Sequence, residues 1–146
     1  MMQDRTFRGQ SADGVWHEGF LIRSPGVKNS RPGEGWYINS EQEPAYAHLV
    51  KPFTIGMNTT LTDENGVPVF EGDILEDDRC GKDVIFSVRY VEYIDYGVGH
   101  IGFYAEFSEN RKELVEHGLA SLVLTAKVVG NVVDTPELMG MSTGKE

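Results

Sequence analysis

One short segment constrains the fold more than any other: residues 61–70 place Asn65-Gly66 between two apolar flanks. Asn-Gly favours a tight type I′ turn, in which both central residues take positive φ, so the segment predicts a β-hairpin. Glu71-Gly72-Asp73 follows directly. A glycine inside a strand pattern predicts a bend or a bulge, so the next strand should start at a sharp corner. Closely spaced strands are therefore expected around this segment.

In the rest of the chain, short β-rich runs are separated by Gly, Asn and Asp. This pattern is typical of a mainly β protein. Residues 24–35, with two Pro and three Gly, predict an exposed loop. The pattern of residues 39–50 is ambiguous. Helix is expected at residues 109–117, with a single further turn begun by Pro136. Strands are expected at residues 6–10, 15–23, 36–38, 83–96, 100–107 and 119–133, and a short strand or strand entry at 52–55.

A length of 146 residues suits one domain with a shared core. We expect an N-terminal hairpin lobe with its loop at residues 1–50. A small, partly open β-barrel with one short helix should follow at residues 51–139, and residues 140–146 should form a tail.

The charge is unevenly placed. Residues 1–50 carry 5 basic and 6 acidic side chains, whereas residues 51–146 carry 8 basic and 17 acidic, for a net charge of -10. A duplex-binding protein normally offers a basic face, so nucleic-acid binding is not the first expectation, and a basic protein partner fits better. Nucleic-acid binding stays open as an alternative through the cations of the near-neutral N-terminal part, which are Arg5, Arg8, Arg23, Lys28 and Arg31.

No catalytic constellation is visible, so the sequence predicts neither an enzyme nor a cofactor. A single cysteine, Cys80, excludes an internal disulfide and a CxxC pair. The four histidines show no i, i+2 or i, i+4 spacing, and each is interpreted as a surface residue. One alternative is a divalent-cation site in the acidic turn at residues 71–78, which contains Glu71, Asp73, Glu76, Asp77 and Asp78.

Location and interface are predicted more loosely. The chain shows no signal-like apolar start and no run long enough to span a bilayer, so we expect a cytoplasmic protein without membrane contact. The alternating segment at residues 83–96 carries Tyr90, Tyr93 and Tyr96. Because exposed tyrosines are enriched at protein interfaces, these three form a candidate interface.

Several motifs follow one another along the chain. They are Phe7-Arg8-Gly9, Pro52-Phe53-Thr54-Ile55-Gly56, Leu61-Thr62-Asp63-Glu64-Asn65-Gly66, Val69-Phe70-Glu71-Gly72-Asp73-Ile74, Val128-Val129-Gly130-Asn131-Val132 and Pro136-Glu137-Leu138. Together these motifs resemble the YopX protein family of small phage and prophage proteins, and all but the first are the stronger matches. Thr60 stands where the family usually has Gly.

The resemblance implies a mostly β, homo-oligomeric protein of uncharacterised function, encoded by a phage and acting in the host cytoplasm. Its Glu71-Gly72-Asp73-Ile74 turn is similar to one in SH3-like barrels, so the predicted barrel is SH3-like. We interpret the shared motif as fold determinants. These are Thr54, Gly56, Asp63, Asn65, Gly66, Glu71, Gly72, Asp73, Gly130 and Asn131.

The leading hypothesis is a non-enzymatic protein-interaction module that self-associates and binds a host or phage protein. The acidic second part and the tyrosine-rich segment motivate it. Nucleic-acid binding and divalent-metal dependence are the two alternatives.

Overall fold

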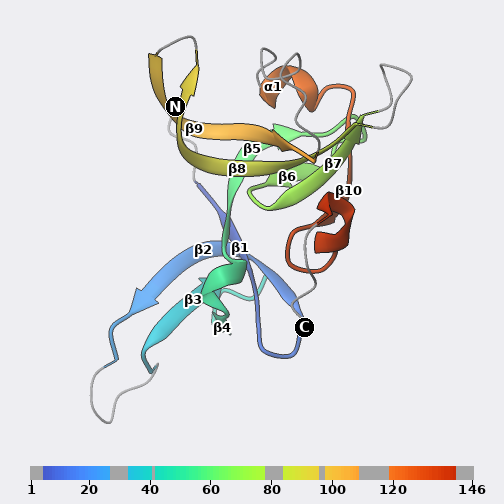
Figure 1. The fold of residues 1–146 in the computed structure, drawn as a ribbon. Helices are drawn as coiled ribbons and strands as arrows, with labels where there is room; N and C mark the ends of the chain where they lie inside the picture. Colours follow the sequence, from blue (N-terminus) through green and yellow to red (C-terminus); the bar gives the residue numbers. More distant parts are fainter. Residues whose placement is uncertain are drawn as a thin grey trace. The chain divides into compact units, whose positions relative to one another are not determined.

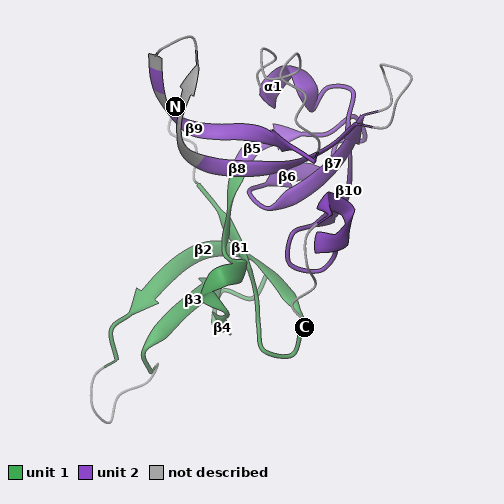
Figure 2. Ribbon diagram, viewed as in Figure 1, with its two compact units in different colours: residues 1–58 green, residues 59–146 purple. Residues whose placement is uncertain are grey.

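The computed structural model describes residues 5–26, 33–40, 42–77, 84–95, 98–108 and 119–140 of the chain. These residues confirm the mainly β prediction, because they form two antiparallel sheets of six and four strands and one short α-helix (Figure 1). The described residues form no closed barrel. The chain divides into two compact units, residues 1–58 (unit 1) and residues 59–146 (unit 2) (Figure 2).

Unit 1 contains a short, bent β-structure. The strand β2 changes partner at Gly19, because its first half pairs with one neighbour and its second half with another. A Cβ on Gly19 would lie 2.1 Å from the carbonyl oxygen of Asn39, so only glycine fits at this bend. The elements are β1 (Phe7–Gln10), β2 (Trp16–Ser24), β3 (Gly35–Asn39), β4 (Ala47–Val50), the 3₁₀ helix η1 (Pro52–Thr54) and the start of β5 (Gly56–Thr62).

Unit 2 contains the end of β5 and a four-stranded sheet. Its elements are β6 (Pro68–Phe70), β7 (Asp73–Asp77), β8 (Val84–Asp95), β9 (Val98–Phe107), α1 (Leu119–Leu122), β10 (Lys127–Asn131) and the 3₁₀ helix η3 (Pro136–Met139). The strand orders of the two sheets are β4-β3-β2-β1-β5-β6 and β10-β7-β8-β9.

Several sequence predictions need correction. Residues 52–55 do not begin a strand, because Pro52 opens a 3₁₀ turn in which the amide of Thr54 bonds the carbonyl of Lys51. The long strand predicted at residues 119–133 is also wrong at its start. Leu119–Leu122 form one helical turn that buries two leucines, and the strand begins only at Lys127. The helix predicted at residues 109–117 and the thiol of Cys80 lie outside the described residues.

The predicted hairpin forms, but its turn is not type I′. Gly66 has φ 79°, whereas Asn65 does not adopt positive φ. The carboxylate of Asp63 accounts for the difference, because its Oδ1 accepts the backbone N–H groups of Asn65 and Val67, each at 2.9 Å. This bonding favours a longer turn with one left-handed glycine over a tight two-residue turn.

A single apolar cluster forms the core of unit 2. Phe86 lies at its centre with no exposed surface, and its ring packs 5.6 Å from that of Phe107. Each buried side chain of this size stabilises the fold by roughly 1.5–3 kcal/mol. The cluster consists of Val69, Leu75, Phe86, Val88, Leu119, Leu122, Val123 and Ala126.

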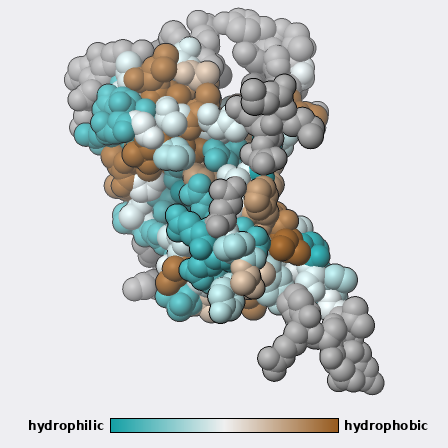
Figure 3. All heavy atoms as spheres, turned by 180° about the vertical axis from the view of Figure 1, so that it is seen from behind, coloured by the Kyte–Doolittle hydropathy of each residue, from teal (hydrophilic) through white to brown (hydrophobic). Residues whose placement is uncertain are grey.

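Apolar side chains also reach the surface, where hydrophobic patches alternate with hydrophilic ones (Figure 3). In unit 1 the exposed set includes Phe20 and Ile22 on β2 and Leu49 on β4, and β3 lies between these two strands in the sheet. Within the described residues, no helix is long and apolar enough to cross a membrane.

Candidate functional site

Two histidines that are far apart in sequence stack against each other in unit 1. His17 lies on β2 opposite Gly9, and His48 lies on β4 opposite Ile38. Their ring centroids are 3.9 Å apart and the ring planes differ by 11°. The bend of β2 at Gly19 accompanies this approach, since β2 leaves β1 there and turns along β3.

Polar groups surround the pair. The hydroxyl of Ser11 lies 3.2 Å from Nε2 of His17, and Ser11 also bonds the carboxylate of Asp13. Nε2 of His48 is buried without a hydrogen-bond partner, and Oε2 of Glu43 lies 3.6 Å from it. A buried nitrogen without a partner is costly, so this position is less settled than an ordinary core residue.

The surroundings lower the pKa of His17 below its usual 6.5. Burial is the largest cause and the charge of His48 the next, while the carboxylates of Asp13 and Glu43 act in the opposite direction. Two unit charges about 4 Å apart repel by roughly 4 kcal/mol at an effective dielectric constant near 20. The stacked pair therefore disfavours a doubly protonated state.

Two hollows of unit 1 meet at this pair, since Val15, His17 and His48 line both. The first hollow has a volume of about 450 Å³ and contains the carboxylates of Glu18 and Glu43. The second is about 780 Å³ and is mainly apolar. Ligand sites commonly have volumes of about 300–1,000 Å³, so each hollow is large enough for a side chain or a small molecule.

The second hollow is lined by backbone and side chains from β2, β3, β4 and the turns beside them. Its apolar lining includes Val15, Trp36, Leu49, Val50 and Pro52, and its charged lining consists of Asp13, Glu34 and Lys51.

The geometry does not suit nucleophilic catalysis or a metal at the described residues. Asp13 bonds Ser11 and no bond joins it to His17, so no carboxylate orients the imidazole as a nucleophilic triad requires. Parallel stacked imidazoles also cannot point their nitrogens at one ion. No group of three His, Cys, Asp or Glu side chains in the described ranges is arranged to hold a metal.

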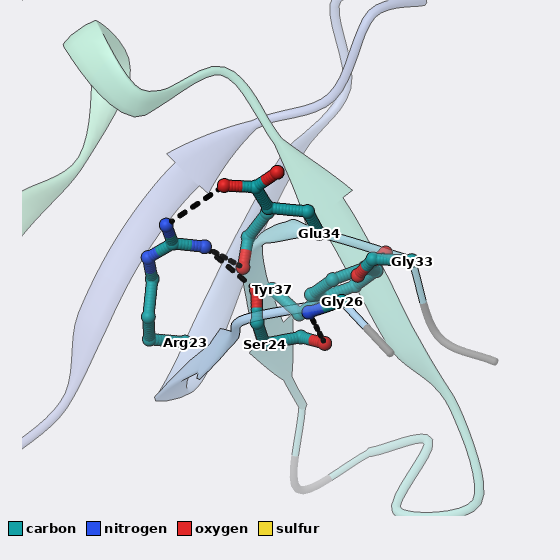
Figure 4. A network of polar contacts seen from close by, with 7 residues as sticks. Arg23, Ser24, Gly26, Gly33, Glu34 and Tyr37 are labelled. Carbon is teal, nitrogen blue, oxygen red and sulfur yellow. Dashed lines mark hydrogen bonds and ion pairs between the residues drawn. The ribbon is translucent and has the colours of Figure 1, made fainter. Parts of the chain in front are cut away.

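Beside the second hollow, a polar network holds the base of the β2–β3 connection (Figure 4). Nη1 of Arg23 donates to the carbonyl of Ser24 at 2.6 Å, and Nη2 lies 3.4 Å from Oε1 of Glu34. The hydroxyl of Tyr37 donates to the carbonyl of Gly33 at 3.1 Å. Arg23 therefore has a structural role at this position.

The motif residues of the sequence analysis lie at structural corners. The hydroxyl of Thr54 accepts the N–H of Gln10 at 2.9 Å, and Gly56 pairs with Arg8. Gly72 has φ 94°, and the carboxylate of Asp73 accepts the N–H of Phe70 at 2.7 Å. Gly72 therefore takes the left-handed conformation at this corner, and Asp73 accepts a backbone N–H beside it.

The C-terminal motif behaves in the same way. Oδ1 of Asn131 accepts the N–H groups of Val133 and Asp134 at 3.0 and 2.8 Å. A Cβ on Gly130 would lie 2.1 Å from the hydroxyl oxygen of Thr135, so the close turn depends on glycine there.

Two buried carboxylates of the acidic turn form hydrogen bonds within the protein. Oδ2 of Asp73 bonds a backbone amide, and Oδ2 of Asp77 accepts the hydroxyl of Thr125 at 2.9 Å. Glu71 and Glu76 are half-buried, and Asp78 lies outside the described residues.

The tyrosine interface is described only in part. Tyr90 is exposed and meets the ring of Phe103 edge-on at 4.9 Å. The side chain of Tyr93 and the whole of Tyr96 lie outside the description, so this interface stays a prediction.

Comparison with known proteins identifies the family. The family model described as YopX protein matches residues 22–140. The chain belongs to the YopX family. The crystal structure of protein EF1440 from Enterococcus faecalis is similar to it, with 20% identity over 94% of this chain and 99% of that chain, and a TM-score of 0.50. At this identity the likeness shows a shared fold alone. No curated protein matches the chain.

The YopX match confirms the resemblance seen in the sequence. It begins inside β2, so it includes His48 but not His17. Sequence reasoning missed the histidine pair because its members lie on different strands, where no local spacing relates them. His17 falls in the strand predicted at residues 15–23, whereas His48 falls in residues 39–50, whose pattern is ambiguous, so no signal in the sequence pairs the two.

Proposed function

We propose that this YopX protein is a non-enzymatic interaction module that self-associates and binds a host or phage protein in the cytoplasm. The observation that carries the proposal is an exposed apolar row on the sheet of unit 1. Ile22 pairs with Tyr37, and Tyr37 pairs with Leu49, so the three side chains share one sheet face.

The row is accessible at its ends. Ile22 is 44% exposed and Leu49 is 54% exposed, while Tyr37 between them is buried. Phe20, two residues before Ile22 on the same face, adds a further exposed ring. Exposed apolar side chains at both ends of a row on one sheet face favour association with another protein surface.

Charge favours unit 1 as the surface for self-association. Residues 1–58 contain six Lys or Arg and six Asp or Glu, so unit 1 has no net charge and unit 2 carries the whole -10. Two copies that meet through unit 1 experience the least repulsion. The strand β4 is also at the edge of its sheet, where backbone groups are available for pairing.

Unit 2 has the role of a scaffold in this proposal. Gly72 uses its N–H to bond the carbonyl of Val88 and its carbonyl to accept the N–H of Val132, each at 2.8 Å. This corner between β6 and β7 supports the SH3-like, partly open barrel that the family motif implies.

Light scattering with one variant tests the proposal. We expect the wild-type chain of 16.3 kDa to scatter as an oligomer, and Ile22→Arg to scatter as a monomer, because a charge interrupts the apolar row. Leu124→Arg is the control, since Leu124 is 71% exposed in unit 2. A wild-type monomer at high concentration, or equal effects of the two variants, contradicts self-association through unit 1.

Single-stranded nucleic acid is a second candidate, favoured by cation–aromatic pairs. Arg8 lies 5.0 Å from the ring centre of Trp16, Arg23 lies 5.5 Å from that of Trp36, and Lys51 lies 5.6 Å from that of Phe53. Cations interleaved with rings suit stacked bases and phosphates. Binding of a labelled oligothymidylate that weakens with salt and with Arg8→Gln supports this candidate, and no binding at low salt removes it.

A further inference from the structure

The two hollows beside the histidine pair differ in chemistry. The first contains two carboxylates, Glu18 and Glu43, and its lining includes no Lys or Arg. The second presents apolar surface from Val15, Trp36 and Leu49. They share His17 and His48 as a common wall, so a ligand that occupies both must pair a polar cationic group with an apolar one.

The charged residues that line the two hollows determine whether an anionic or a cationic ligand fits. The first hollow has a formal charge of −2 from its two carboxylates. The second has Asp13 and Glu34 against Lys51, and because Glu34 is paired with Arg23 the charges there nearly balance. An anionic ligand would be repelled at the first hollow, whereas a Lys or Arg side chain would be attracted to it.

Some side chains that line the hollows already interact with other residues, and this limits which of them can bind a ligand. Glu34 is already paired with Arg23, so it is less available to a ligand. The ring of Trp16 lies beside the guanidinium of Arg8, so a ligand cation must be attracted mainly by the carboxylates. The buried Nε2 of His48, 3.6 Å from Glu43, leaves a polar group at the wall of the first hollow without a hydrogen bond.

We propose that these hollows form a binding site for an extended peptide segment of a partner protein that carries a Lys or Arg residue beside an apolar residue. The basic side chain occupies the carboxylate-lined hollow and the apolar side chain occupies the hollow beside Trp36. The proposal rests on the proposed interaction function, and it names the chemistry of the partner.

The geometry also gives a built-in reporter for occupancy. The chain has two tryptophans, and Trp16 lines the first hollow whereas Trp36 lines the second. Trp16→Phe and Trp36→Phe therefore separate the fluorescence responses of the two hollows. A peptide that fills both should change the emission of each single-tryptophan variant.

The test measures anisotropy of a dye-labelled Gly-Arg-Leu-Arg-Leu-Gly peptide against the full chain. Peptides with Glu in place of Arg, or Ser in place of Leu, examine each hollow separately. We expect Glu18→Gln combined with Glu43→Gln to weaken binding of the Arg-Leu peptide by at least about fivefold, and binding to weaken with salt. The matched control combines Glu64→Gln with Glu137→Gln, which changes the net charge equally at two exposed positions of unit 2.

Several results overturn the proposal. It fails if the Arg-Leu peptide does not bind, if the Glu-Leu peptide binds as well, or if both double variants lose affinity equally, which indicates long-range charge alone. It also fails if only an oligothymidylate binds. Circular dichroism confirms that each variant is folded.

The outcome is separable from that of the proposed self-association. Ile22 and Phe20 line neither hollow, so the Ile22→Arg chain keeps the peptide site whatever its oligomeric state. Peptide binding by an Ile22→Arg monomer supports the hollows as a site. Leu49 belongs to the apolar row and also lines the second hollow, so an oligomer can cover that hollow. The deciding result is therefore that of the Ile22→Arg monomer, which rejects the hollows if it does not bind the peptide.

Discussion

The two units are stabilised in different ways. Among the described residues, unit 2 buries eleven apolar side chains and unit 1 only three, which are Tyr37, Ile38 and Val50. Unit 1 also buries the polar side chains of Gln10 and Thr54 and holds the half-buried stacked rings of His17 and His48. Unit 1 therefore has less hydrophobic stabilisation, and it contains a buried nitrogen, Nε2 of His48, without a hydrogen-bond partner.

This difference indicates that unit 2 mainly stabilises the fold and that unit 1 provides the binding surfaces. A well-packed core gives one stable arrangement, whereas binding surfaces are commonly taken from the less stable parts of a protein. The hollows and the apolar row lie in unit 1. Unit 2 contains the carboxylates of Asp63 and Asp73, which accept backbone N–H groups, and that of Asp77, which accepts the hydroxyl of Thr125. The predictions below test whether the two units respond separately.

The largest expected effect is Phe86→Ala. Phe86 is fully buried at the centre of the unit 2 cluster, so its truncation should lower the free energy of unfolding by about 3–5 kcal/mol. Urea unfolding followed by far-ultraviolet circular dichroism measures this loss. Both tryptophans, Trp16 and Trp36, lie in unit 1, so their fluorescence should report a much smaller shift.

Ile38→Ala is the matched change in unit 1, because Ile38 also has no exposed surface. It should cost about 2–5 kcal/mol and move the tryptophan transition first. If either variant shifts both transitions by the same amount, the chain unfolds as one cooperative body and the comparison between units has no thermodynamic basis.

The next effect concerns Asp63. Its carboxylate accepts three backbone N–H groups, from Asn65, Val67 and Val128, each at 2.9 Å. Asp63→Ala leaves these donors without their acceptor and should lower the free energy of unfolding by about 2–4 kcal/mol. Urea unfolding by circular dichroism measures it, and Asp63→Asn should lose less because its amide keeps one acceptor oxygen.

Acid should destabilise the protein in part by protonating the carboxylate of Asp63. Burial is the largest influence on Asp63 and raises its pKa, but the three N–H donors together outweigh it, so the pKa falls below 3.8. The stabilisation is complete above pH 3.8 and is lost as the pH falls through the lower native value. A smaller acid dependence in Asp63→Asn than in the wild type is therefore expected. An unchanged acid transition would assign it to other carboxylates.

A stabilising change is expected at Thr60. It is the one non-glycine in the described residues with positive φ, at 68°. The left-handed conformation costs a residue with a Cβ about 1–2 kcal/mol. A glycine avoids this cost but loses about 0.5–1 kcal/mol more backbone entropy on folding. Thr60→Gly should thus raise the free energy of unfolding by up to about 1 kcal/mol in urea titrations.

Thr62→Gly provides the control, because Thr62 is exposed in the same strand without positive φ. It should destabilise by about 0.5–1 kcal/mol. Destabilisation by both glycines would show that the side chain of Thr60 contributes more than its backbone strain costs.

Much of the fold could be predicted from the sequence because its signals are local. Asp63 and Asp73 each accept a backbone N–H from a residue close by in sequence, and Gly72 takes the left-handed conformation at its own position. Turn chemistry expresses such local features directly. The type I′ assignment was wrong because the carboxylate of Asp63 binds two amides across the turn and thereby selects another geometry.

The candidate site could not be predicted, because it depends on pairing between distant segments. The stack of His17 on His48 follows from the register of β1–β2 and β3–β4, which no spacing in the sequence reveals. The helical turn at Leu119 was missed for a related reason. Its leucines are buried against the distant core residue Phe86, and this packing overrides the β-rich local composition.

The smallest expected effect is a pH dependence confined to unit 1. Burial and the charge of His48 hold the pKa of His17 below 6.5 in the folded chain. The unfolded chain therefore binds the proton more readily, so the free energy of unfolding should fall as the pH drops below 6.5. The loss should level off once folded His17 is protonated as well. Tryptophan-detected urea unfolding between pH 8 and pH 5 measures it.

His17→Phe separates this titration from others. The phenyl ring keeps an aromatic partner for His48 but cannot take up a proton, so the tryptophan-detected stability should become flatter over the same pH range. Circular dichroism of the unit 2 transition should be indifferent to the change. If His17→Phe retains the wild-type slope, the pH response does not come from His17, and the stacked pair does not distinguish unit 1 from unit 2 in the way its geometry indicates.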